Sequence, residues 1–165
     1  MSDLSFLLYA GGAVLLIVFL VIVAAYVLSS LAASRVLKIY GYKNAWMAWI
    51  PVLNFYALGD AAVPHSLAFG GVELPAILFK VWWLLSFAVG YIPEIGSWLS
   101  LAVQIFFLGS VITEIYAAVE GKKKEDVRIL GYLSGWIPII SWIKFLTYDK
   151  AKRIAEPEVE AVNEK

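Results

Sequence analysis

The sequence predicts an all-α protein whose helices cross a lipid bilayer several times. Of its 165 residues, 62% are hydrophobic and only 16% are charged, whereas soluble domains are usually about half apolar and about a quarter charged. The apolar residues form long runs, which a soluble core does not require. Basic residues cluster after these runs, as they do in the cytoplasmic loops of membrane proteins. We therefore expect polytopic transmembrane helices, with three full spans and two proline-broken segments that are re-entrant or interfacial.

The first run, from Phe6 to Ala32, contains no charged residue. It exceeds the roughly 20 residues that a helix needs to cross the hydrocarbon core. Ser30 to Ala33 resembles the cleavage site of a signal peptide. A signal peptide, however, has a shorter apolar region behind a positively charged start, and here the only charged side chain ahead of the run is Asp3. We therefore expect an uncleaved membrane anchor.

Two further runs, Pro75–Ile92 and Ile95–Val119, supply the other predicted spans. Between the first and second spans, the run Ala45–Leu58 is too short to cross. The last run, Ile129–Tyr148, is interrupted by glycines and by Pro138. We expect both broken runs to enter from the cytoplasmic side or to lie along it; a fourth full span in the last run is the alternative.

The positions of the basic residues set the predicted orientation. They follow the first span, the third span and the last run, whereas the loop at Glu94 contains only an acidic residue. Because basic loops stay in the cytoplasm, we expect an extracytoplasmic N-terminus and a cytoplasmic C-terminus. Seven of these residues are candidates for contact with anionic lipid headgroups: Arg35, Lys38, Lys43, Lys122, Lys123, Lys124 and Arg128.

The two broken runs have a similar residue order. In each, Gly-Tyr is followed by Trp-Ile-Pro and then by a small polar residue, which suggests repeat-like units at 6–60 and 93–149 joined by a helix at 75–92. The alternative is that Trp-Ile-Pro simply ends a segment at the headgroup level. Together these parts form a predicted membrane domain, 1–154, followed by a disordered tail, 155–165. The candidate break and interface residues are Trp49, Pro51, Asn54, Trp136, Pro138 and Ser141.

The stretch from Lys43 to Tyr56 resembles a Lys-x-x-Trp-x-x-x-Ile-Pro-x-x-Asn motif of small uncharacterised bacterial multipass membrane proteins. This resemblance covers a small part of the chain, and no activity is attached to it. It implies a bacterial plasma-membrane setting. The second copy departs from the motif, with Ser141 in the place of Asn54.

Three polar residues lie inside the predicted spans. Lys80 and Glu114 would sit at similar depths, so we expect an ion pair between them, or a Lys80 that extends alone toward the headgroups. Gln104 lies nearer the middle of its span, where it can hydrogen-bond a neighbouring helix.

Several classes of function lack any signal in the sequence. The 13 basic and 13 acidic residues balance, which gives no reason to expect nucleic acid. There is no cysteine for thiolate chemistry, and no hydrolase, phosphate-loop or zinc-protease motif occurs. The only histidine, His65, has no defensible metal-site spacing with Asp60 and Glu73. We therefore expect no cofactor and no metal.

These observations favour a non-enzymatic membrane subunit or adaptor that acts through helix–helix and lipid contacts. Its expected partners are membrane lipids and either another protein or further copies of itself. Two alternatives stay open. One is a small transporter or pore-forming component with a path lined by Lys80, Gln104 and Glu114, and the other is a lipid-modifying membrane enzyme.

Overall fold

A computed structural model describes residues 3–149 and residue 154, with side chains from residue 9 onward. In chain order the elements are α1 (Asp3–Ile39), the 3-10 helix η1 (Ala45–Trp49), α2 (Pro51–Ala62), β1 (Ser66–Phe69), β2 (Val72–Pro75), α3 (Ala76–Gly90), α4 (Gly96–Glu120), α5 (Lys124–Trp136) and α6 (Pro138–Thr147). The predicted helical class is confirmed. The sequence did not predict the antiparallel hairpin β1–β2, which turns at Gly70 and Gly71, both with positive φ. The predicted tail lies outside the described residues.

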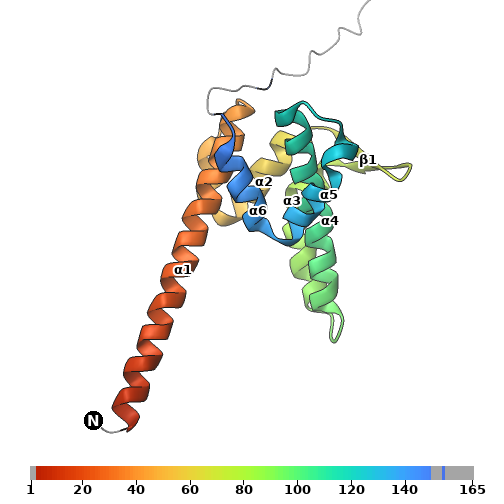
Figure 1. Cartoon of the computed structure of the whole chain (residues 1–165). Helices are drawn as coiled ribbons and strands as arrows, with labels where there is room; N and C mark the ends of the chain where they lie inside the picture. Colours follow the sequence, from red (N-terminus) through yellow and green to blue (C-terminus); the bar gives the residue numbers. More distant parts are fainter. Residues whose placement is uncertain (1–2, 150–153, 155–165) are drawn as a thin grey trace, which may run out of the picture.

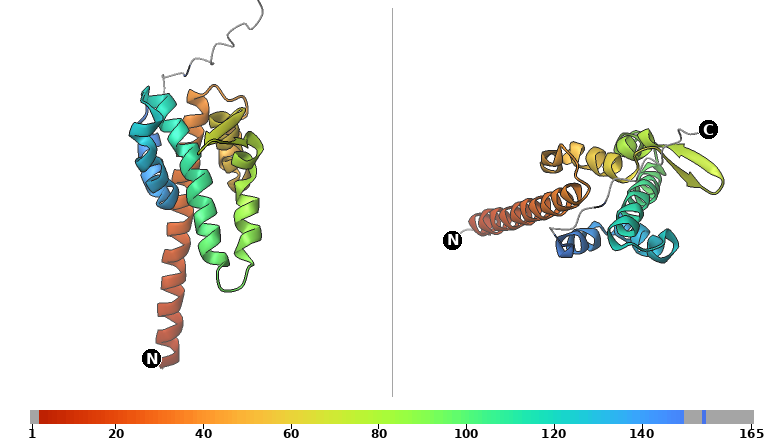
Figure 2. Two further views of the ribbon diagram at one scale, coloured as in Figure 1. Left: turned by 90° about the vertical axis from the view of Figure 1, so that its right-hand side faces the viewer. Right: turned by 90° about the horizontal axis from the view of Figure 1, so that it is seen from above.

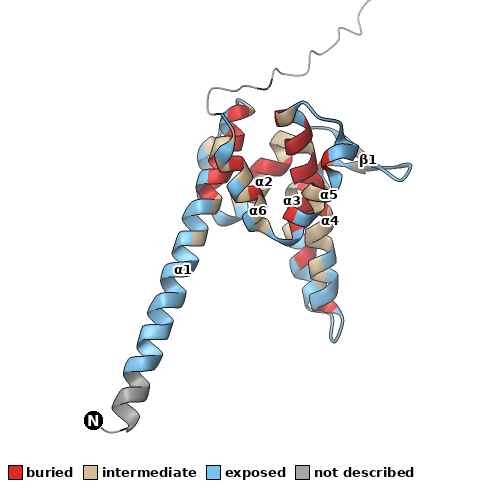
Figure 3. Cartoon of the chain, in the orientation of Figure 1, coloured by how far each residue is buried: buried red, intermediate tan, exposed pale blue. Residues whose placement is uncertain are grey.

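Helix α1 is one continuous helix, most of which stands apart from the rest of the chain. Residues 9–24 are exposed all around, and only the last turns reach the core, where Ala32, Val36 and Leu37 are fully buried. Figure 3 shows this contrast along the helix, and Figure 2 shows that α1 diverges from the other helices toward its start. By length and composition, two helices can cross a membrane: Tyr9–Ile39 and Gly96–Glu120.

Helices α3 and α4 form an antiparallel hairpin. Its turn carries Glu94 with φ 66°, and Ser86 and Ser100 hydrogen-bond across it at 2.7 Å. With 15 residues, and a non-helical Val81 (φ −116°, ψ 16°), α3 is shorter than the predicted span. At about 1.5 Å per residue it covers roughly 22 Å, less than the ~30 Å hydrocarbon core.

Each proline-broken run folds as two pieces that meet at an angle. Pro51 begins α2 and Pro138 begins α6, while the preceding residues are not helical: Ile50 has φ −111° and ψ 118°, and Ile137 has φ −117° and ψ 85°. A proline is favourable in the first helical turn and disfavours helical geometry in the residue before it. The sequence-predicted breaks therefore occur at these two prolines. The second run differs in its start, because α5 already begins at Lys124.

The long helices begin and end at two opposite ends of the molecule (Figure 1). The start of α1 and the turn between α3 and α4 lie toward one end of the molecule, and the ends of α1 and α4 lie at the other (Figure 1). From that second end the segments η1–α2 and α5–α6 each run inward and turn back (Figure 1). The core lies between these two segments, and its buried residues include Phe79, Ile112 and Tyr116.

Candidate functional site

A cavity of about 230 Å³ lies where the two broken segments approach each other. Helices α1, α2, α3, α4 and α6 all contribute to its wall, which is mostly apolar and aromatic. Among the described residues that line it, none is charged. The polar side chains in the wall include three that the sequence singled out: Asn54, Gln104 and Ser141.

Asn54 and Ser141 occupy equivalent positions in their helices. Each lies three residues after the proline that begins its helix, and therefore at the end of the first turn. Both are buried, with 8% of Asn54 and 3% of Ser141 exposed. The Ser141 hydroxyl donates to the Pro138 carbonyl at 2.7 Å, whereas the Asn54 Oδ1 atom has no hydrogen-bond partner in the described part of the chain. Leaving a buried amide oxygen unpaired costs about 1–3 kcal/mol of folding stability. The unpaired oxygen of Asn54 is therefore an unusual feature of the wall.

Gln104 connects the cavity wall to α5. Its Nε2 atom donates to the Gly135 carbonyl at 3.2 Å. Helix α5 lies this close to α4 because glycines form the contact: a Cβ atom on Gly135 would lie 2.7 Å from the Gly109 backbone nitrogen, and one on Gly131 would lie 2.0 Å from the Thr113 Oγ1 atom. The sequence reasoning missed this contact. Its signal was Gly131-x-x-x-Gly135, a spacing that allows close helix packing in membranes.

The predicted pair of Lys80 and Glu114 does not form, and each residue has a different partner. Lys80 Nζ lies 2.5 Å from Asp60 Oδ1, and Glu114 Oε1 lies 2.8 Å from Lys124 Nζ. The packing of the helices explains why Lys80 and Glu114 have these partners and do not pair with each other. Gly59 lets α2 approach α3, since a Cβ there would meet the Phe79 carbonyl at 2.2 Å, and Asp60 follows Gly59. Neither Lys80 nor Glu114 lines the cavity.

Asp60 also accepts a hydrogen bond from Tyr42, at 2.7 Å. Burial acts to raise the pKa of Asp60, but the hydrogen bonds from Lys80 and Tyr42 outweigh it and hold that pKa below the ordinary value. Burial and the same carboxylate raise the pKa of Tyr42 well above its usual range. In its ionised form the Asp60 carboxylate therefore links α2 to Lys80 of α3 and to Tyr42 in the loop after α1.

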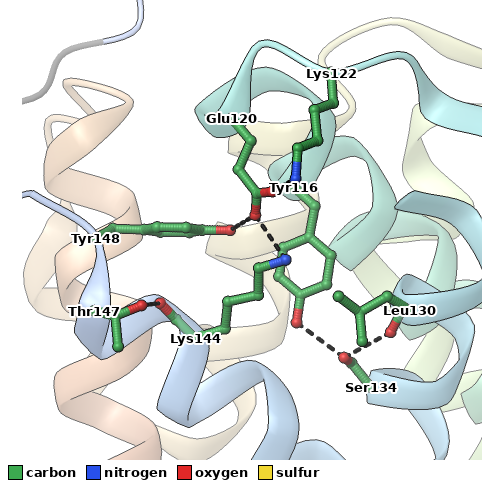
Figure 4. A network of polar contacts seen from close by, with 8 residues as sticks. All are labelled: Tyr116, Glu120, Lys122, Leu130, Ser134, Lys144, Thr147 and Tyr148. Carbon is green, nitrogen blue, oxygen red and sulfur yellow. Dashed lines mark hydrogen bonds and ion pairs between the residues drawn. The ribbon is translucent and has the colours of Figure 1, made fainter. Parts of the chain in front are cut away.

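Glu120, at the end of α4, is the centre of a second polar cluster (Figure 4). Its carboxylate contacts Lys144 at 2.7 Å and Lys122 at 2.8 Å, and it accepts a hydrogen bond from the Tyr148 hydroxyl at 2.8 Å. Burial is the largest cause that raises the pKa of Tyr148, and this hydrogen bond is the second. Lys144 also lies 4.1 Å from the centre of the Tyr116 ring, in cation–π geometry. These contacts fasten α6 to α4.

The seven predicted headgroup-binding residues differ in their exposure and in their partners. Arg35 is half-buried and donates to the carbonyls of Leu146 and Tyr148 at the end of α6, where helical carbonyls lack partners. Lys124 pairs with Glu114, and Lys122 with Glu120. Three other predicted contacts have exposed side chains: Lys38, Lys43 and Lys123. Arg128 is exposed and lines a second pocket of about 130 Å³ beside Glu114. Lipid contact itself stays a prediction.

The tryptophans at the two breaks are both accessible. Trp49 is 42% exposed and Trp136 is 56% exposed, and the Tyr26 hydroxyl donates to the Trp49 carbonyl. His65 lies in the exposed segment before β1. Within the residues that the structure describes, no group of three or more histidine, aspartate or glutamate side chains is placed to hold a metal ion.

No protein-family model, no curated protein and no solved structure matches the chain. The resemblance at 43–56 therefore stays a prediction.

Proposed function

We propose that the chain is an integral protein of the bacterial plasma membrane that acts as a non-enzymatic subunit or adaptor. In this proposal α1, α3 and α4 cross the bilayer, which thins locally around the short α3. The segments η1–α2 and α5–α6 enter from the cytoplasmic side and return to it. The chain would act through contacts of its helices with lipid and with a partner.

The exposed part of α1 is the observation that carries this proposal. Only 6% of its most apolar window is buried inside the molecule, so its side chains need an apolar environment from outside the chain. A span of about 20 residues matches the hydrocarbon core. The loop after α1 carries Lys43 and the turn after α4 carries Lys123, whereas the turn between α3 and α4 carries Glu94. The first two lie at the opposite end of the molecule from the third (Figure 1), which supports the predicted orientation.

Labelling of single cysteines tests the membrane part of the proposal. The chain contains no cysteine, so Lys43→Cys, Glu94→Cys and Lys123→Cys each provide one thiol. In intact cells an impermeant maleimide should label only the Glu94→Cys protein, and permeabilisation should expose the other two. Labelling of Glu94 and Lys43 variants from the same side would contradict the three crossings.

The subunit role has a separate test. After extraction in a mild detergent, the tagged chain should purify with a partner or as an oligomer whose mass exceeds that of one chain, measured by light scattering with the detergent subtracted. A monomer without any bound protein would contradict the subunit role. It would leave the membrane topology standing.

The cavity supports transport as a second candidate function, because interrupted helices build the substrate sites of many transporters. In this reading Asn54, Gln104 and Ser141 line the path, while Lys80 and Glu114 serve only as structural partners. Proteoliposomes containing the chain should then swell faster in uncharged solutes such as glycerol than protein-free liposomes. Equal swelling rates would contradict transport of such solutes.

A further inference from the structure

We propose that the cavity between the two broken segments is a binding site for a small, uncharged, mostly apolar molecule with one hydrogen-bonding group. This inference depends on the wall of the cavity and not on the number of membrane crossings. It can therefore fail or succeed independently of the proposed function.

The size of the cavity sets the size of the ligand. An apolar cavity of roughly 150 Å³ is large enough for benzene. The volume here, about 230 Å³, exceeds that and corresponds to a molecule of two fused rings. Phe55, Trp82, Trp142 and Phe145 line this space, and aromatic side chains provide large, rigid surfaces for a flat apolar ligand.

The chemistry of the wall excludes a charged ligand. No described lining residue carries a charge, and an ion without a partner in such a site pays a large desolvation cost. A fully apolar ligand would leave the Asn54 amide as unsatisfied as it is now. The Asn54 Oδ1 atom is itself closed off from the cavity, so a ligand with one hydroxyl or amide-like group would provide the missing partner once the amide turns toward it.

Asn54 is suited to recognise that group. It is 92% buried, lines the cavity, and has an Oδ1 atom without a hydrogen-bond partner in the described chain. The terminal torsion of asparagine is broad, so rotation of the amide can present either its oxygen or its nitrogen to the cavity. Ser141, on the opposite broken segment, lines the same space. Each proline break thus delivers one polar side chain to a common apolar site.

Binding of 2-naphthol to the full chain in lipid nanodiscs tests the proposal. The matched probe is 2-methylnaphthalene, which has the same rings but a methyl group in place of the hydroxyl. Empty nanodiscs correct for partitioning into lipid. We expect saturable binding of 2-naphthol that is about 2- to 13-fold tighter than that of 2-methylnaphthalene, the ratio for one hydrogen bond of about 0.5–1.5 kcal/mol.

The Asn54→Leu variant should bind both probes with equal affinity. Asn44→Leu is the control, because Asn44 is exposed and its side chain makes no cap hydrogen bond at η1; this variant should keep the preference. If Asn54→Leu does not fold, Ala33→Leu replaces it: Ala33 lines the cavity, and the added side chain should weaken binding of both probes.

Three results would overturn the proposal. They are an absence of saturable 2-naphthol binding above empty nanodiscs, equal affinity of the wild-type chain for the two probes, and an undiminished preference in the Asn54→Leu variant. The first would mean that the cavity holds only water or lipid chains. The other two would mean that Asn54 does not recognise the ligand.

Discussion

Replacement of Gly135 by alanine should separate α5 from α4. The added Cβ would lie 2.7 Å from the Gly109 nitrogen and 2.9 Å from the Gly109 Cα atom. Ordinary contact begins at 3.4 Å, so the helices must move apart by about 0.7 Å. Both atoms belong to backbone, and no side-chain rotation can relieve the clash. The movement would also stretch the hydrogen bond from Gln104, which is already 3.2 Å long.

Overpacking of this kind costs about 1–3 kcal/mol. Alanine favours the helix by up to about 1 kcal/mol more than glycine does, so we expect the free energy of unfolding to fall by roughly 0–2 kcal/mol. This decrease is measured by unfolding the protein in mixed detergent micelles that contain increasing amounts of dodecyl sulfate. Gly12→Ala is the control, because Gly12 is helical and a Cβ there meets nothing within 4 Å. A Gly135→Ala protein as stable as the Gly12→Ala protein would refute the close α4–α5 contact.

Three further predictions concern the polar clusters. In a double-mutant cycle, Lys80→Met and Asp60→Asn should show a coupling of about 0.5–3 kcal/mol, whereas Lys80→Met and Glu114→Gln should be additive; the reverse pattern would restore the pair predicted from the sequence. Because the pKa of Asp60 is lowered in the folded state, its contribution to stability should be lost as the pH falls below the ordinary value of 3.8. Unfolding curves of Asp60→Asn should lack that part of the pH dependence, and an identical profile would count against it. Tyr148→Phe removes a hydrogen bond to Glu120 and should cost about 1.5–3 kcal/mol in the same unfolding assay, while Tyr91→Phe, at a residue 72% exposed, should cost little.

The sequence predicted the helical class and both helix breaks because these depend on local properties. A proline constrains the residue before it and removes one backbone donor, and these effects act wherever the chain is placed. The breaks at Pro51 and Pro138 could therefore be located without knowing the tertiary structure. The β1–β2 hairpin was missed, although Gly70-Gly71 between short strands is a typical hairpin turn.

The partners of the charged residues could not be predicted in the same way. Their depth along each helix suggested that Lys80 and Glu114 could meet, but depth does not say which helices are neighbours. Gly59 brings α2 against α3, and Gly131 and Gly135 bring α5 against α4. These contacts supply Asp60 and Lys124 as the actual partners. The cavity depends on the same long-range packing, so the sequence indicated Asn54, Gln104 and Ser141 individually but not the space that they share.

In the proposed topology, both broken segments enter the membrane from one side and turn at the same depth. Of the chain's 7 tryptophans, Trp49 and Trp136 stand at the two turns. Variants that retain only one of them, placed in bilayers of lipids brominated at known positions along their chains, report the depth of each turn. We expect the same brominated lipid to quench both tryptophans most strongly. Strongest quenching of one at the bilayer centre and of the other near the headgroups would contradict it.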